Sequence, residues 1–203
     1  MEEEGQERVR ITEKPELAPV LGELEEGQQT NVLEQLEAAD ARLAALRDEL
    51  AERSGRDSWT TTGVALERLE SGQARILGEV DDAGEGMTFQ LELRPRNFFN
   101  EDNPWRPGQP PRPMATDAWD LEGAVLVMRQ TRISGRKYTV QETAEELPET
   151  RYTSVDEAVG AFAAMAEELA GLALSRDPLP SAWFEEEEGE EGEEGEEEVP
   201  SAL

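Results

Sequence analysis

The stretch Met87–Arg94, with the sequence MTFQLELR, alternates apolar and polar side chains along its whole length. Its apolar positions are Met87, Phe89, Leu91 and Leu93. Because successive side chains of a strand point to opposite faces, this alternation predicts a β-strand with one apolar and one polar face. Such a strand belongs to a sheet that is covered on one side only.

Further strands are predicted on both sides of this stretch, separated by turn residues such as Ser71–Gly72 and Ser134–Gly135. Hairpins between consecutive strands imply an antiparallel sheet of about five strands. Residues 144–152 are interpreted as a connection that leads to the last helix. The predicted strands span residues 59–69, 73–80, 87–94, 119–129 and 136–142.

Two segments, 32–50 and 155–173, carry apolar residues at helical spacing and predict amphipathic helices. Asn31 with Glu34 provides a capping pair for the start of the first helix. The apolar stripe of this helix also fits a heptad repeat. It therefore favours either packing on the domain's own sheet or a helix-to-helix dimer seam. The stripe consists of Val32, Leu36, Ala39, Leu43, Leu46 and Leu50.

These elements predict one α+β domain, in which an antiparallel sheet of about five strands is flanked by two amphipathic helices. The domain spans residues 30–178 and follows a flexible N-terminal segment, residues 1–29. Residues 179–203 are expected to form a disordered acidic tail, because the eleven glutamates within Glu185–Glu198 bury no apolar surface. The predicted core residues are Leu36, Leu43, Leu46, Phe89, Leu91, Leu93, Leu126, Val159, Phe162 and Leu169.

Acidic residues dominate the composition: 48 Asp and Glu against 19 Lys and Arg give a formal net charge of −29. This charge disfavours nucleic acid and anionic membranes as partners and favours a basic protein. The sequence has no cysteine and no histidine, which excludes thiolate and imidazole chemistry and the commonest metal ligands. We therefore expect no catalytic residue, metal or cofactor. The N-terminal residues lack a secretory signal, and the absence of cysteine fits the cytoplasm.

One segment departs from the acidic composition and forms a basic island. Residues 123–141 contain no acid, while Arg129, Arg132, Arg136 and Lys137 supply four positive charges. Three interpretations remain open. The segment is a solvated hairpin with local ion pairs, a docking site for an acidic partner or for the chain's own tail, or a phosphate or nucleic-acid contact.

A proline-rich loop, residues 95–115, holds six of the twelve prolines. Proline cannot donate to a strand ladder, so the segment is expected to be irregular. Its aromatic residues are Phe98, Phe99 and Trp105. They serve either to cover the domain's own core or to anchor a partner, and the sequence PGQPPRP is compatible with a polyproline conformation.

The order helix, three strands, insert, two strands, helix, in a small acidic chain without cysteine, resembles the secretion-chaperone and YbjN-like group of folds. Members of that group are generally dimeric, acidic, non-enzymatic binders of other polypeptides. The resemblance covers roughly residues 32–174 and concerns the order of elements. It implies a homodimer that binds a polypeptide.

Charge and composition lead to the same functional expectation. We expect a non-enzymatic acidic protein-binding module of the chaperone, adaptor or inhibitor type, acting on a basic or exposed polypeptide, without a membrane. One alternative is a structural or assembly component that self-associates through helix 32–50 or the proline-rich loop. The other is a carboxylate-based hydrolase, since two acids suffice for glycoside hydrolysis.

Overall fold

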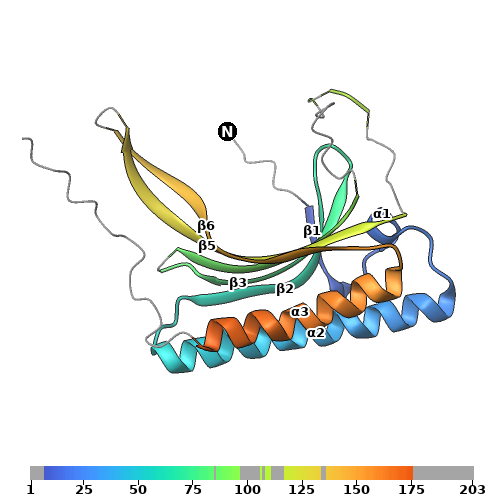
Figure 1. Ribbon diagram of the computed structural model, residues 1–203, viewed down its shortest axis with the longest axis horizontal. Coiled ribbons are helices and arrows are strands. Elements are labelled where there is room, and N and C mark those ends of the chain that lie inside the picture. The colour runs from blue at the N-terminus through green and yellow to red at the C-terminus, as the bar shows by residue number, and fades with distance from the viewer. Residues whose placement is uncertain are drawn as a thin grey trace, which may run out of the picture.

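The computed structural model describes residues 7–84, 86–96, 106, 108–110, 117–133 and 136–175. Six strands form one antiparallel sheet, in which each strand pairs with its neighbours in sequence (Figure 1). The strands are β1 (Glu7–Arg10), β2 (Trp59–Arg68), β3 (Ala74–Asp82), β4 (Met87–Pro95), β5 (Trp119–Ile133) and β6 (Arg136–Tyr152). The helices are the 3-10 helix η1 (Ile11–Glu13), α1 (Ala18–Leu21), α2 (Glu26–Ser54) and α3 (Val155–Ser175). The predicted α+β class is confirmed.

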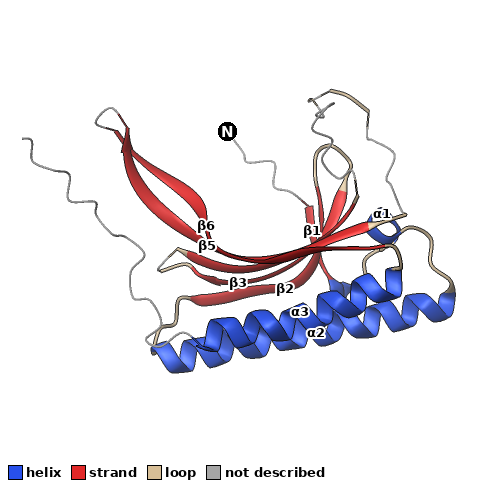
Figure 2. Ribbon diagram, in the orientation of Figure 1, coloured by secondary structure: helices blue, strands red, loops and turns tan. Residues whose placement is uncertain are grey.

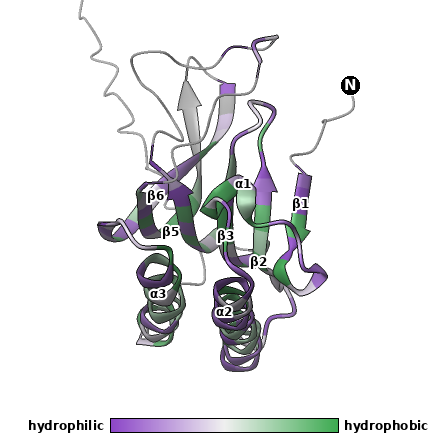
Figure 3. Cartoon of the chain, turned by 90° about the vertical axis from the view of Figure 1, so that its right-hand side faces the viewer, coloured by the Kyte–Doolittle hydropathy of each residue, from purple (hydrophilic) through white to green (hydrophobic). Residues whose placement is uncertain are grey.

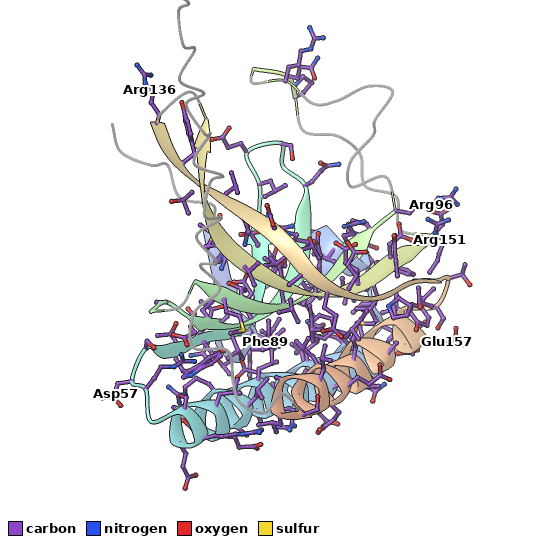
Figure 4. All side chains as sticks on the ribbon, turned by 60° about the vertical axis from the view of Figure 1, so that its left-hand side comes forward. Asp57, Phe89, Arg96, Arg136, Arg151 and Glu157 are labelled. Atoms are coloured by element: carbon purple, nitrogen blue, oxygen red, sulfur yellow. The ribbon has the colours of Figure 1, made fainter. Side chains whose placement is uncertain are left out.

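Helices α2 and α3 lie side by side on one face of the sheet (Figures 2 and 3). Their apolar stripes meet the apolar face of the strands, where Phe89 lies between the two layers (Figure 4). Both helices approach the sheet closely at Gly78 of β3. A Cβ atom placed there would lie 2.7 Å from Leu43 Cδ1 and 3.4 Å from the Phe162 ring. Gly78 therefore lets both helices sit tightly against the sheet.

All predicted core residues are fully buried except Leu126. Leu126 is half-buried and pairs with Thr88 on the face away from the helices. Its neighbours Val125 and Val127 are the residues that enter the core. The prediction for Leu126 was wrong because residues 124–128 are apolar at every position, so alternation does not reveal which residues face inward.

Helix α3 is long and apolar enough, by length and composition, to cross a membrane. In this structure its apolar side packs on the sheet, with Val159, Phe162 and Leu169 fully buried. Core helices of globular proteins pass the same test, so the finding fits the position of α3 in the fold.

The N-terminal residues from 7 onward belong to the domain, whereas the sequence suggested a flexible segment over 1–29. Strand β1 pairs with β2, and Ile11 and Val20 are fully buried. The Trp119 indole N–H donates to the Val20 carbonyl at 2.9 Å. Helix α2 accordingly begins at Glu26, before the expected capping pair. These contacts join residues far apart in sequence, so no local periodicity of the sequence predicts them.

Strand β6 continues through residues 144–152, which were interpreted as a connection. Two irregularities in the β5–β6 register, between Leu121 and Gly123 and between Val125 and Leu126, place extra β6 residues in the ladder. β6 is the last strand of the sheet, and a proline such as Pro148 is tolerated in an edge strand. The predicted acidic tail lies outside the described residues, as does most of the proline-rich loop.

Candidate functional site

The sheet face opposite the helices carries a layer of charged side chains, called here the charged face. Its residues come from five neighbouring strands and alternate with the core residues along each strand, as period two requires. The members are Arg8 (β1), Glu67 (β2), Arg75 and Glu79 (β3), Glu92 and Arg94 (β4), and Glu122 (β5).

Arg8 connects the N-terminal strand to the rest of this layer. Its Nε lies 2.8 Å from Glu67 Oε1, and its Nη1 lies 2.5 Å from Glu79 Oε2. Glu67 has no exposed surface and also accepts from Arg75 Nε at 2.6 Å. One buried carboxylate thus ties together β1, β2 and β3.

A second set of ion pairs continues across β4 and β5. Arg75 Nη1 lies 3.0 Å from Glu92 Oε1, and Arg94 Nη1 lies 2.7 Å from Glu122 Oε1. Burial lowers the pKa of Arg75, but the charges and hydrogen bonds of Glu92 and Glu67 outweigh burial and raise it overall. Both arginines of this set therefore remain charged, and the layer forms a continuous cross-strand network.

Two carboxyl groups of the charged face stand directly opposite each other, Glu92 on β4 and Glu122 on β5. Burial raises the pKa of Glu122; Arg94 lowers it, and the negative charge of Glu92 raises it again, with a raised pKa as the result. Glu92 is almost fully buried and ion-paired with both Arg75 and Arg94. A glycosidase needs room for a sugar between its two acids, whereas Arg94 bridges this pair and so links β4 to β5.

The raised pKa of Glu122 predicts a pH effect on stability. The folded state holds this proton more tightly than the unfolded state, so the contribution of Glu122 to stability falls as pH rises above about 4.5. Glu122→Gln should therefore gain stability relative to wild type between acid and neutral pH, by less than about 1 kcal/mol because the group is half exposed. Urea unfolding at both pH values measures this difference.

The control is Glu146→Gln, which removes one negative charge from an exposed position on the neighbouring strand β6. If both variants changed in parallel with pH, general charge repulsion would account for the effect and Glu92 would have no special influence.

The four basic residues of the basic island lie on a hairpin arm, formed by residues 129–133 of β5 and 136–140 of β6. Strand β4 pairs with β5 only as far as Val127, so within the described part of the chain the two halves of the arm pair with each other alone. The arm projects beyond the sheet, with Arg136 at its tip (Figures 1 and 4). Tyr138 on the arm is 44 % exposed.

The structure describes some of the predicted site residues and not others. The backbones of Arg129, Arg132 and Lys137 belong to the arm, in which Arg132 pairs with Lys137. Their side chains are not among the described ones, whereas that of Arg136 is exposed. The aromatic residues Phe98, Phe99 and Trp105 lie outside the described residues.

The acidic edge of the sheet was not predicted from the sequence. Residues 141–149 of β6 contain Glu142, Glu145, Glu146 and Glu149 and no basic residue. All four side chains are exposed. The acids were visible in the sequence, but the strand was not, because Pro148 and the run of polar residues are typical of a loop.

Within the described ranges, no group of three or more acidic side chains is arranged to hold a metal ion. Comparisons of the chain with protein-family models, with curated proteins and with solved structures find no match. The resemblance to the secretion-chaperone group gains no support from them. The function must therefore be inferred from the surfaces of the chain itself.

Proposed function

We propose that the chain is a non-enzymatic, acidic protein-binding module of the chaperone, adaptor or inhibitor type, and that its partner is a basic polypeptide. The acidic edge is the observation that carries this proposal. It places four exposed carboxylates, without a base among them, along one side of an ordered sheet. Charge of one sign on a fixed scaffold accelerates encounter with an oppositely charged partner and selects against others.

The charged face is less suited to attract such a partner. Its three arginines are ion-paired with its four glutamates, so most of its charge is compensated within the layer. The four glutamates of the acidic edge are exposed, whereas Glu67, Glu79 and Glu92 of the charged face are buried. The electrostatic attraction is therefore assigned to β6, and a cytoplasmic location, which the lack of cysteine fits, is part of the proposal.

Self-association through the helix 32–50 is disfavoured by the packing of that helix. Its apolar stripe is buried against the domain's own sheet, with Leu36, Leu43 and Leu46 fully covered. A dimer seam along this stripe would require the core to open. Of the two interpretations of the stripe, the structure shows packing on the sheet.

Binding to a lysine-rich polypeptide should be strong at low salt and at least about tenfold weaker at physiological salt, because the attraction is between exposed charges. A variant lacking residues 185–203 should keep this salt-sensitive binding, because the acidic edge belongs to the folded domain. Fluorescence anisotropy with a labelled lysine-rich peptide measures the dissociation constants of both chains at low and at physiological salt. A glutamate-rich peptide of equal length is the control.

Two results would count against the proposal. Absence of salt-sensitive binding in the full-length chain would remove the basic partner. Complete loss of binding in the variant without residues 185–203 would show that the glutamate run alone attracts the peptide and that the domain is no binding module.

A further inference from the structure

We infer that the partner binds by strand addition to the outer edge of β6, between Gln141 and Leu147. This inference rests on the proposed function and names its site and its mode. The bound segment would be extended and basic, and it would add a seventh strand to the sheet. In strand addition the backbone supplies affinity, and side chains beside the edge supply selectivity.

The direction of the β6 backbone follows from one hydrogen bond on β5. The N–H of Met128 donates to the Gly86 carbonyl at 2.7 Å, so it points toward β4 and away from β6. In an antiparallel pair, opposed residues either bond to each other or both point away. Gln141 stands opposite Met128, and its N–H and C=O therefore point to the outer side of the sheet.

The same argument applies along the strand. Leu126 and Ala124 precede Met128 at intervals of two residues, and their N–H groups also point toward β4, because the β4–β5 register is uninterrupted. Their partners on β6 are Thr143 and Glu146. Gln141, Thr143 and Glu146 thus present their backbone donors and acceptors at the free edge.

This edge is open within the described part of the chain. β6 is the terminal strand of the sheet, and residues 141–146 are all exposed. The opposite edge is formed by β1, which has four residues, Glu7–Arg10. The β6 edge is therefore the longer of the two templates for an added strand.

The charges of the edge select the occupant. Glu142 and Glu145 stand in register with the core residues Val127 and Val125, so they belong to the helix side of the sheet. Glu146 stands opposite Ala124 and belongs to the other side. An added strand would meet carboxylates on both of its faces. A second copy of β6 would bring like charges together, whereas a lysine- or arginine-rich segment complements both faces.

The length of the site is bounded at both ends. On the C-terminal side, Pro148 has no N–H to donate to an added strand. On the N-terminal side of Gln141 the strand belongs to the basic arm, where Arg136 and Lys137 would repel a basic segment. The available stretch of seven residues, 141–147, lies within the usual strand length of about three to ten residues.

A proline substitution tests the backbone contact. Thr143→Pro removes an outward N–H while leaving the bonds between β5 and β6 in place, and it should weaken binding of an alternating lysine–threonine peptide by about tenfold or more, since strand addition depends on main-chain bonds. Thr143→Val removes the hydroxyl, keeps the N–H, and should bind within about twofold of wild type. Circular dichroism shows whether Thr143→Pro is folded.

Amide hydrogen exchange of the wild-type chain gives a test that needs no variant. The peptide should slow exchange at Gln141, Thr143 and Glu146 by about tenfold or more if an added strand protects them. Unchanged exchange there, with the peptide still bound, would overturn the β6 site while leaving the proposed function intact. Failure of the peptide to bind at all would overturn both. Two further results would overturn the inference. Protection of these amides without peptide that depends on protein concentration would identify a second copy of the chain as the occupant. Protection without peptide that is lost when residues 176–203 are removed would identify the chain's own C-terminal residues as the occupant.

Discussion

Gly63→Ala should lower the free energy of unfolding by about 3 kcal/mol. Gly63 lies at a β-bulge of β2 and has a φ of 66°, in the left-handed region. A side chain at such a φ costs about 1–2 kcal/mol. In addition, the new Cβ would lie 1.9 Å from Oδ1 of Asp40, so the side chain must displace this carboxylate, and overpacking of this kind costs about 1–3 kcal/mol.

Displacing the Asp40 carboxylate should lower the free energy of unfolding, because this group has a structural role. It projects from α2, is almost fully buried, and accepts the N–H of Val64 at 2.7 Å. Arg10 of β1 lies 3.4 Å from it. Moving Asp40 would leave the buried Val64 N–H without its acceptor, at a cost of about 1–3 kcal/mol.

Gly55→Ala is a matched control for this prediction. Gly55 also has a φ of 66°, but a Cβ placed there has no atom within 4 Å. Its cost in urea unfolding measures the backbone term alone, and the excess at Gly63 measures the conflict with Asp40. Equal costs at both glycines would show that the bulge tolerates the added methyl group. In the double variant Gly63→Ala with Asp40→Ala, the two costs should be clearly less than additive.

Glu67→Ala should lower the free energy of unfolding by about 2–3 kcal/mol. This loss is at or below the low end for a broken buried ion pair, because the arginine partners of Glu67 are partly exposed. Glu67 is fully buried and holds both Arg8 and Arg75. Removing it leaves two positive charges in the centre of the charged face with fewer partners. The loss should be largest for the docking of β1, which Arg8 fixes to the sheet.

The exposed Glu146 offers a control for Glu67 on the same sheet. Its substitution by alanine should change stability by less than about 0.5 kcal/mol. Hydrogen exchange of the β1 amides in Glu67→Ala would show whether β1 separates first. A stability loss as small as that of Glu146→Ala would mean that the network contributes little, as isolated surface ion pairs do.

Elements with a regular local pattern could be predicted from the sequence. The strand Met87–Arg94 and the buried stripe of α2 appear where alternation and helical spacing indicate them. The strand β1 could not be predicted, because its four residues gain their structure from pairing with β2, far away in sequence. The continuation of β6 through Pro148 depends on its position at the sheet edge, which the residues themselves do not encode.

The same limit applies to the functional surfaces. The basic island was visible as a run without acids, and the structure places it on the hairpin arm. The acidic edge was not predicted, since four glutamates around a proline are typical of a solvated loop. The role of Asp40 could not be predicted either, because a single carboxylate in a helix does not indicate that it accepts a hydrogen bond beside a bulge of β2.

Helix α3 ends at the end of the molecule from which the hairpin arm projects (Figure 1). Arg53, near the end of α2, donates to the carbonyl of Leu174 there. In the sequence, the glutamate run begins ten residues after Ser175, the last residue of α3. Tethering by a short linker gives an effective concentration of about a millimolar. We therefore expect a soluble anion that binds the arginines of the arm to compete with the carboxylates of the glutamate run.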